Sequence, residues 1–344
     1  PRAVTPGMVI PFGVFRALLE QPLEAGGPSV FDWMRAEYAR IATVADETDR
    51  KQQLERFLAR LRHWIRNAEP DEEFRSRLRA RMDAVFGDAE TVGVFVRSDT
   101  NVEDLPGFSG AGLNLTVPNV VGFEAVVKAV QEVWASPFKP RAYAWRQSHM
   151  TDPEHVYPAV LLQQTFTSEK SGVLITSDVA SGDRRWLSIA TGEGVGGAVA
   201  GQAAEELQVH RDSGEIKLLA QASAPLRSEP VPHGGIRKVP ASGSDTVLTT
   251  VEIQQLIALA EDVEQQFPMP VGEDGLRAPA DIEFGFRDGR LALFQIRPFV
   301  ESPYARRSRY LSELDSANEV DKGAGVDLLE PPSQREQRGV NNAH

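Results

Sequence analysis

Hydrophobic positions in the first quarter of the chain recur at the three- and four-residue steps of amphipathic helices. A short apolar run at residues 8–10 predicts a strand, and a turn after it leads into a helix over residues 14–19. The helical spacing then continues through residues 30–86, with repeating positions at Leu54, Phe57, Leu58, Leu61 and Ile65, followed by Phe74, Leu78, Met82 and Val85. We therefore predict three packed helices in this segment, whose Arg and Glu residues form a solvated face.

Beyond residue 87 the pattern changes to short apolar runs separated by glycine-rich or polar segments. A buried strand is predicted at residues 91–96, a glycine-rich loop at 101–112, and helices near 123–134 and 141–149. Further strands are predicted at residues 159–165, 171–176 and 185–190, with a hairpin turn at 212–214. This part of the chain is expected to be rich in strands.

A capped helix and a hairpin complete the pattern. Thr249 and Glu252 have the spacing of a capping box at the start of a helix. Strands at residues 281–287 and 290–297 flank an Asp-Gly dipeptide, which is typical of a two-residue hairpin turn. The last part of the chain is therefore expected to contain one helix packed near a two-stranded unit.

Composition excludes several classes of function. The 344 residues include no cysteine, so disulfides, thiolate metal sites and cysteine nucleophiles are unavailable. The net charge of -12 is spread along the chain without a basic stripe, which argues against nucleic acid as a partner. No apolar run approaches the roughly 18 residues of a membrane span. We expect a cytoplasmic protein without a membrane partner, and a polar tail or linker over residues 304–344.

The first candidate site begins at Arg97, directly after a predicted buried strand. Hydroxyl side chains and glycines follow as far as Gly112 and Thr116. A planar guanidinium and backbone amides left accessible by glycine are suited to a polyphosphate. In the alternative, Arg97 pairs with Glu103 or Asp104 in a tight surface loop, and the residue types leave both interpretations open.

The second candidate site is the final hairpin. Period-two alternation places Asp281 and Glu283 on one face of their strand, and Gln295 and Arg297 on one face of theirs. A carboxylate and an amide oxygen suit Mg²⁺, and an adjacent arginine can hold the phosphates that the metal bridges. The alternative is an ordinary hairpin with a cross-strand ion pair between Glu283 and Arg297.

Two weaker signals accompany these sites. The glycine-rich loop at residues 191–197 has no Walker lysine, so it either folds over phosphates or turns a corner. Gln163 ends a predicted strand, where it either reads an adenine edge or ribose or is simply solvated. Neither feature is specific by itself.

Taken in order, these segments resemble the nucleotide-binding domain of phosphoenolpyruvate synthase and pyruvate phosphate dikinase. The ordered set consists of Arg97-Ser98, the glycine loop, Gln163 with Ser171-Gly172, Gly192-Glu193, Asp281-Ile282-Glu283 and Gln295-Ile296-Arg297. Within that superfamily, several segments look most like alpha-glucan water dikinases, namely residues 9–15, 97–101, 103–105, 110–113, 133–136 and 141–143. The resemblance covers about residues 5–298.

The resemblance implies an α+β fold of the ATP-grasp type, in which two lobes grip the nucleotide. We expect an N-terminal lobe over residues 1–155 that includes the helical segment 30–86, and a C-terminal lobe over residues 156–303. The implied roles are Arg97 and Arg297 on the phosphates as catalytic residues, Gly112 and Thr116 in the phosphate loop, Gln163 near the nucleoside, and Glu283 and Gln295 on magnesium.

Enzymes of this type transfer the β-phosphate of ATP to a histidine on a mobile domain and release AMP. The implied cofactors are ATP and Mg²⁺. The implied partner is a phosphohistidine domain, in the same longer protein or in trans, and an alpha-glucan is one candidate for the final acceptor, beside pyruvate and a rifamycin-like alcohol. The protein positions the substrates and neutralises charge.

Two features of the family pattern are absent from this sequence. Its phosphate-binding lysine belongs to a segment upstream of residue 1, and no histidine follows a glycine- and hydroxyl-rich turn. We expect a fragment of a longer protein that binds Mg-ATP but turns over poorly or not at all. The alternatives are a nucleotide-sensing or scaffold module without catalysis, and an ATP-grasp ligase that joins a carboxylate to an amine.

Overall fold

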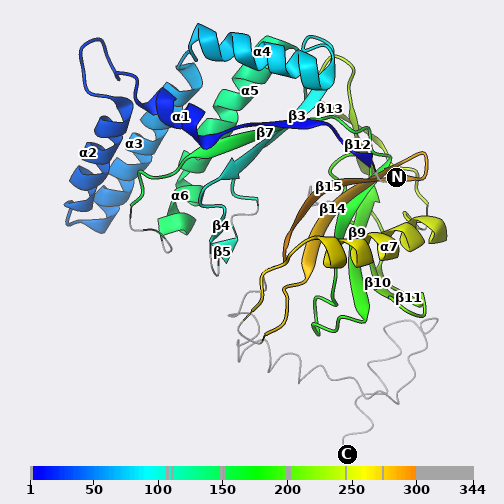
Figure 1. Cartoon of the computed structure of the whole chain (residues 1–344). Helices are drawn as coiled ribbons and strands as arrows, with labels where there is room; N and C mark the ends of the chain where they lie inside the picture. Colours follow the sequence, from blue (N-terminus) through cyan, green and yellow to red (C-terminus); the bar gives the residue numbers. More distant parts are fainter. Residues whose placement is uncertain are drawn as a thin grey trace, which may run out of the picture. The chain divides into compact units, whose positions relative to one another are not determined.

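The chain folds into a mixed α+β structure (Figure 1). The computed structural model describes residues 3–105, 108–109, 112–147, 150, 152–198, 203–244, 246–272 and 275–299. The polar tail predicted over residues 304–344 lies outside the described residues, as do residues 106–107 and 110–111 of the predicted glycine-rich loop. The elements described belong to the compact unit Pro1–Val300.

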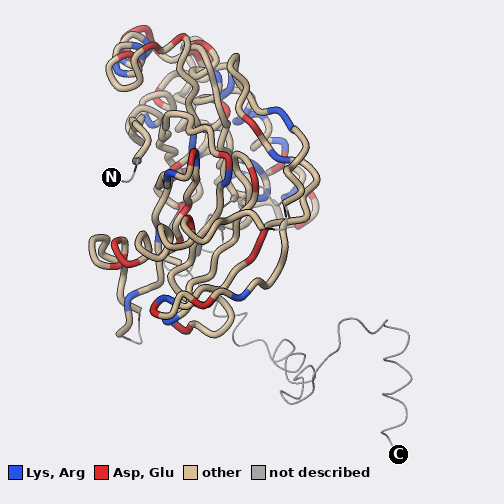
Figure 2. Tube along the Cα trace, turned by 90° about the vertical axis from the view of Figure 1, so that its right-hand side faces the viewer, with Lys and Arg blue, Asp and Glu red and all other residues tan. Residues whose placement is uncertain are grey.

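Three helices occupy residues 30–86, which confirms the periodicity argument. They are α2 (Val30–Ala42), α3 (Glu47–Asn67) and α4 (Glu72–Phe86). Each begins after a residue whose side-chain oxygen accepts a hydrogen bond from the backbone amide three positions later, and these caps are Ser29, Asp46 and Asp71. Both basic and acidic residues occur along this segment, and Figure 2 shows the two signs interspersed along the described chain.

A four-stranded antiparallel sheet forms the first of two hydrophobic layers. Its order is β2 (Gly7–Ile10), β7 (Pro158–Gln164), β3 (Gly93–Thr100) and β6 (Thr116–Val121). It draws on both sides of the predicted lobe boundary between residues 155 and 156, and that boundary stays a prediction.

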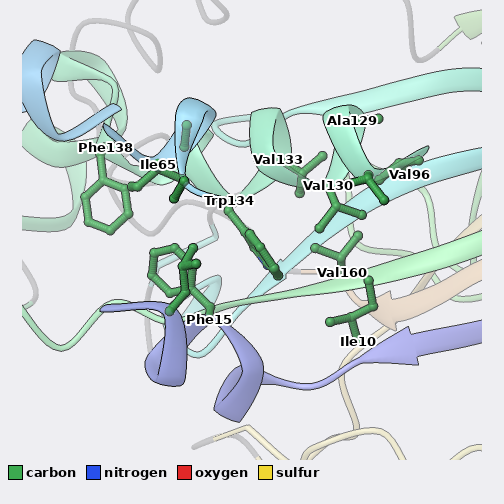
Figure 3. Close-up of a cluster of buried hydrophobic side chains, with 14 of the residues drawn as sticks. Ile10, Phe15, Ile65, Val96, Ala129, Val130, Val133, Trp134, Phe138 and Val160 are labelled. Carbon is green, nitrogen blue, oxygen red and sulfur yellow. The ribbon is translucent and has the colours of Figure 1, made fainter. Parts of the chain in front are cut away.

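Helices α1 (Phe12–Leu19) and α5 (Phe123–Ala135) cover one face of this sheet. The shared core includes Val96 and Val160 from the strands and Trp134 from α5, which packs at 5.8 Å between ring centroids against Phe15 of α1 (Figure 3). The opposite face of β3 and β7 is therefore left available for other contacts.

A seven-stranded sheet forms the second layer. Its order is β1 (Ala3–Val4), β15 (Arg290–Pro298), β14 (Ala280–Arg287), β8 (Lys170–Ile175), β9 (Trp186–Glu193), β10 (Glu205–His210) and β11 (Ile216–Ala220). All neighbours are antiparallel except β1, which runs parallel to β15. Helix α7 (Thr250–Gln266) packs on this sheet through apolar side chains such as Leu256 and Val263 (Figure 1).

The remaining elements are short. They are the pair β12 (Leu226–Pro230) and β13 (Ile236–Pro240), the pair β4 (Asp104–Leu105) and β5 (Phe108–Ser109), the 3₁₀ turn η1 (Ser136–Phe138) and helix α6 (Pro140–Gln147). Strands β12 and β13 were not expected from the sequence. Across the described residues, no helix combines the length and the apolar run needed to cross a membrane.

One predicted boundary is wrong in a way that affects the site. The sequence places Arg97 just after a strand at residues 91–96, whereas β3 continues to Thr100. Pairing with β7 continues as far as Thr100 and stabilises this extension, whereas pairing with β6 ends at Arg97. Arg97 is therefore held inside a sheet rather than in a loop.

Candidate functional site

A cavity of about 400 Å³ lies where residues of the two sheets approach each other. Its walls come from β3, β6 and β7 of the four-stranded sheet, from β8, β14 and β15 of the seven-stranded sheet, and from the loops after β7 and β9. The lining residues are Phe95, Arg97, Thr116, Gln163, Gln164, Phe166, Ser168, Ser171, Gly172, Val195, Gly196, Glu283, Phe284 and Phe294. This set joins aromatic surface to one cationic and one anionic group.

Arg97 connects the two sheets at this cavity. Its Nη1 donates to Oε1 of Gln163 at 3.2 Å, and its Nη2 donates to Oε2 of Glu283 at 2.8 Å and also to Oε1 of Gln295. The side chains of Arg97 and Glu283 are 16% and 19% exposed, so this ion pair is only partly screened by solvent. The fork of the guanidinium thus holds three of the predicted site residues in one network.

Strand alternation explains why these side chains meet. In β3, Val94 and Val96 enter the core, which turns Phe95 and Arg97 to the cavity. Thr116 of β6 is the direct neighbour of Arg97 in the sheet, and Gln163 of β7 is the neighbour of Phe95. The same period-two pattern that builds the core therefore also sets the polar face of the site.

The final hairpin supplies the opposite wall. Its turn has positive φ angles of 52° at Asp288 and 68° at Gly289, as a tight two-residue hairpin requires. Within the ladder Glu283 faces Gln295 and Asp281 faces Arg297, so the expected juxtaposition of the two pairs is confirmed.

The observed ion pairs of Arg97 and Arg297 differ from the two pairings that the sequence left open, namely Arg97 with a nearby acidic residue of its loop and Arg297 with Glu283. Arg297 donates from Nε to Oδ2 of Asp281 at 2.7 Å, and Glu283 pairs with Arg97 instead of Arg297. The carboxylate of Glu103 accepts from Nδ2 of Asn114 at 3.1 Å and from the Thr100 amide, and its pairing with Arg97 is not observed. The side chain of Asp104 lies outside the described residues.

A β-bulge shapes the wall beside Glu283. Strand β15 has one extra residue, Phe294, between the pairs Glu283–Gln295 and Phe284–Leu293. The Phe294 ring covers Gly285, where an added Cβ would lie 2.6 Å from the ring and from Oγ of Ser168. Phe294 also meets Phe166 edge to face at 5.7 Å. An aromatic surface is thereby placed beside the polar network.

The glycine-rich loop at residues 191–197 contributes Val195 and Gly196 to the cavity wall. Gly194 has φ 78°, and a Cβ there would lie 2.3 Å from the carbonyl oxygen of Ser228. The carbonyl of Gly194 also accepts from Oγ of Ser171 at 2.6 Å. The loop is thus fixed against neighbouring strands and borders the cavity, and its folding over phosphates stays a prediction.

Three predicted site residues do not line this cavity, namely Gly112, Arg297 and Gln295. Gly112 is exposed with φ 72°, and Arg297 is held by Asp281 on the strand beside the network. Arg97, Thr116, Gln163 and Glu283 do line it, and Gln295 reaches it through Arg97. The structure thus brings five of the seven residues together, and their chemical roles stay predictions.

The donor set fits a magnesium ion shared with a phosphate ligand. No cluster of three or more His, Cys, Asp or Glu side chains is found in the described part of the chain. Glu283 and Gln295 offer one carboxylate and one amide oxygen as direct cross-strand neighbours. Mg²⁺ commonly takes one or two protein oxygens and completes its shell with phosphates and water.

The aromatic wall was missed by the sequence reasoning. Phe95 had a usable signal, because it lies two residues before Arg97 on the same strand and must share its face. No sequence pattern indicated Phe166 and Phe294, because Phe166 lies in a loop and Phe294 at a β-bulge, where strand alternation does not predict the direction of a side chain.

Comparison with known proteins gives one family and several relatives. Residues 3–316 match the family described as "Pyruvate phosphate dikinase, AMP/ATP-binding domain". A rifampicin phosphotransferase from a Streptomyces species is 32% identical over 59% of this chain and 23% of that protein. A probable phosphoenolpyruvate synthase from Archaeoglobus fulgidus is 33% identical over 61% of this chain and 27% of that protein. The phosphoenolpyruvate synthase of Pyrococcus furiosus is 29% identical over 70% of this chain and 30% of that protein.

The chain therefore spans less than a third of the length of each of these curated relatives. Their names are phosphoenolpyruvate synthase and rifampicin phosphotransferase, and they differ from the alpha-glucan water dikinases that the sequence motifs resemble. The superfamily is supported, and the narrower resemblance is not.

Proposed function

The chain belongs to the family of pyruvate phosphate dikinase AMP/ATP-binding domains, and we propose that it binds Mg-ATP in the cavity around Arg97 as the nucleotide-binding part of a dikinase. The observation that carries the proposal is the network in which Arg97 of one sheet reaches Glu283 and Gln295 of the other. We also propose that the two sheets belong to the two lobes of an ATP-grasp fold.

The lining of the cavity supports one part that binds the base and another that binds the phosphates. The aromatic side chains Phe95, Phe166 and Phe294 offer apolar surface suited to a purine ring, with Gln163 as a hydrogen-bonding neighbour. Arg97 and Thr116 lie at the polar side, where a guanidinium and a hydroxyl suit phosphate oxygens. We assign Gly112 and Arg297 to the phosphate end as well, on the family resemblance alone.

Binding of Mg-ATP requires Arg97 to change partners. Its present acceptors, Glu283 and Gln295, are the two residues proposed to hold Mg²⁺, so a guanidinium and a metal cation compete for the same oxygens. Glu283 and Gln295 would hold Mg²⁺, which would supply charge neutralisation to the phosphates, and Arg97 would then be available to bind phosphate oxygens. Arg97 and Arg297 would stabilise the phosphoryl oxygens during transfer.

The reaction proposed for the whole protein is transfer of the β-phosphate of ATP to a histidine on another domain, with release of AMP. The names of the relatives favour a final acceptor of the kind used in phosphoenolpyruvate synthesis or rifampicin phosphorylation. An alpha-glucan acceptor has no support from them. The phosphohistidine domain is proposed to be a partner in the same longer protein or in trans.

Calorimetric titration with ATP, with Mg²⁺ and with a chelator, tests the nucleotide site. We compare the wild type with Glu283→Gln, which keeps the side-chain shape but removes the charge, and with the matched control Glu206→Gln on the exposed side of β10. We expect Mg²⁺ to tighten binding to the wild type and the control. Glu283→Gln should weaken Mg-ATP binding about tenfold or more, because a charge-assisted metal contact is lost.

Equal affinity of Glu283→Gln and wild type for Mg-ATP would refute the assignment of Glu283. Failure of the wild type to bind any adenine nucleotide would refute the proposed function for this chain. Retained binding without any effect of Mg²⁺ would favour the alternative of a nucleotide-sensing module.

A further inference from the structure

A second cavity, of about 260 Å³, lies at the other end of the seven-stranded sheet and shares no residue with the first. It is lined by Arg184, Arg211, Glu264, Met269, Arg277 and Ala278, which we call the arginine pocket. These residues come from the β8–β9 loop, the residue after β10, the last turn of α7 and the loop before β14.

The arginine pocket is well separated from the candidate nucleotide site. Ser171 and Gly172 line the first cavity near the start of β8, whereas Thr176, whose carbonyl oxygen binds Arg211, follows the end of that strand. A strand rises about 3.3 Å per residue, so these positions lie roughly 15 Å apart along β8. A ligand in one cavity does not directly contact the lining of the other.

Arg211 is the fixed wall of the pocket. Its Nη1 donates to Oε2 of Glu264 at 2.7 Å, and its Nη2 donates to Oε1 of Glu264 at 2.9 Å and to the carbonyl oxygen of Thr176 at 2.7 Å. Its side chain is only 13% exposed. This bidentate contact occupies both oxygens of Glu264 and ties the end of α7 to the end of β8.

Arg184 and Arg277 are not neutralised by this arrangement. Arg184 donates from Nη2 to the backbone carbonyl oxygen of Arg277, which leaves its other donors for a ligand. Among the described residues, neither guanidinium takes part in an ion pair. The lining therefore contains three arginines and one carboxylate, and that carboxylate is paired with Arg211.

The local charge favours a dianion. Three guanidinium groups contribute +3 and Glu264 contributes -1. The carbonyls at the C-terminal end of α7 add about -0.5, because the helix ends beside Glu264. Summed over the described lining residues the value is about +1.5, in a chain whose overall charge is -12. Guanidinium forks match the planar pairs of oxygens on a phosphate group.

We propose that the arginine pocket binds a small phosphate-bearing anion at Arg184 and Arg277, independently of the nucleotide cavity. A volume of about 260 Å³ suits inorganic phosphate, pyrophosphate or a small phosphomonoester. Because Arg211 and Glu264 join α7 to β8, a bound anion would also restrain the end of this helix.

Titration with phosphate probes tests the proposal. Inorganic phosphate, pyrophosphate and glycerol phosphate are each added to the wild-type chain, and binding is followed by calorimetry in a phosphate-free buffer. The variants Arg184→Gln and Arg277→Gln keep the Arg211 to Glu264 contact and should preserve the fold, which thermal unfolding checks. Arg290→Gln, on the exposed start of β15, is the matched control. Arg97→Gln reports on binding at the other cavity.

We expect Arg184→Gln and Arg277→Gln each to weaken binding of the best probe about tenfold, because each removes a charged donor. Arg290→Gln should bind it as the wild type does, and any binding that Arg97→Gln alone loses is assigned to the other cavity. Preference for inorganic phosphate or pyrophosphate over glycerol phosphate would identify a free anion as the ligand, and the reverse would identify a phosphomonoester. No binding of any probe, or binding lost in Arg97→Gln and kept in Arg184→Gln, would overturn the proposal.

Discussion

The partly buried ion pair between Lys170 of β8 and Glu252 of α7 gives a quantitative test of how the cavity wall is held. Lys170 directly precedes Ser171 and Gly172, which line the cavity. Its Nζ donates to Oε2 of Glu252 at 2.7 Å, and the two side chains are 22% and 7% exposed. The pair therefore lies between a surface ion pair, which contributes about 0–1 kcal/mol, and a buried one, whose disruption costs about 3–5 kcal/mol.

Glu252 has a second set of partners that makes the two single substitutions unequal. Its carboxylate also accepts from the backbone amide and hydroxyl of Thr249 at 2.8 and 2.9 Å, in the capping box of α7. After Lys170→Met, Glu252 keeps these bonds and the favourable field of the helix N-terminus, so the cost should be about 1 kcal/mol. After Glu252→Gln, the mostly buried ammonium of Lys170 loses its counter-charge, and we expect about 2 kcal/mol.

A double-mutant cycle measures the coupling. We expect Lys170→Met combined with Glu252→Gln to cost about 2 kcal/mol rather than the additive 3, because no uncompensated charge remains. The free energies of unfolding come from urea titration at neutral pH, with unchanged m values as the condition for comparison. The exposed pair Arg77 and Glu73 is the control, with an expected coupling below about 0.5 kcal/mol.

Additivity of the two substitutions within about 0.5 kcal/mol would refute the reasoning, because it would mean that the contact contributes nothing as a pair. A larger cost for Lys170→Met than for Glu252→Gln would refute the claim that the start of α7 stabilises the carboxylate.

Two further predictions concern backbone space and a buried hydroxyl. Gly172→Ala should destabilise the chain by about 1–3 kcal/mol in the same urea titration, because its Cβ would lie 2.1 Å from the carbonyl oxygen of Ala190, whereas Gly13→Ala, with nothing within 4 Å, should be neutral or stabilising. Equal effects would contradict the argument. Burial raises the pKa of Tyr38 in the folded chain. The neutral Tyr38 side chain therefore contributes to the free energy of unfolding in full below the unfolded pKa of about 10, and this contribution is lost as the pH rises above that value. Tyr38→Phe should weaken this loss of stability in alkaline unfolding curves, and it should cost little at neutral pH because no hydrogen-bond partner of the Tyr38 hydroxyl is found among the described residues. An unchanged alkaline slope would exclude Tyr38 as its source.

Local patterns in the sequence predict much of this fold. The three helices of residues 30–86, the capping box at Thr249 and the hairpin turn at Asp288 each depend on residues close together in the chain. Period-two alternation also suffices to place Glu283 with Gln295 across the final hairpin. These features are predictable because their causes act within a few residues.

The remaining features depend on contacts between distant segments. The extension of β3 past Arg97 depends on pairing with β7, a strand that is distant in the sequence. The extra residue at Phe294 follows from a bulge that alternation cannot indicate, and the aromatic wall of the cavity depends on it. The partner of Arg97 was uncertain in the sequence because Glu103 and Asp104 are near in the chain, whereas Glu283 is near only in the fold.

The pairing of β1 with β15 has a consequence for how the chain acquires its structure. Ala3 lies opposite Ala292 in a parallel ladder, while residues 7–10, only a few positions later, belong to the other sheet. Contacts of such large sequence separation carry a high loop-closure entropy and slow folding. The strand β15, which carries Gln295 and Arg297, is synthesised near the end of the described chain. Strand β1 can therefore pair with β15 only after nearly all of the described chain has left the ribosome. We expect the cavity to form in the last, slow phase of refolding, after the helical core around Trp134 has already assembled.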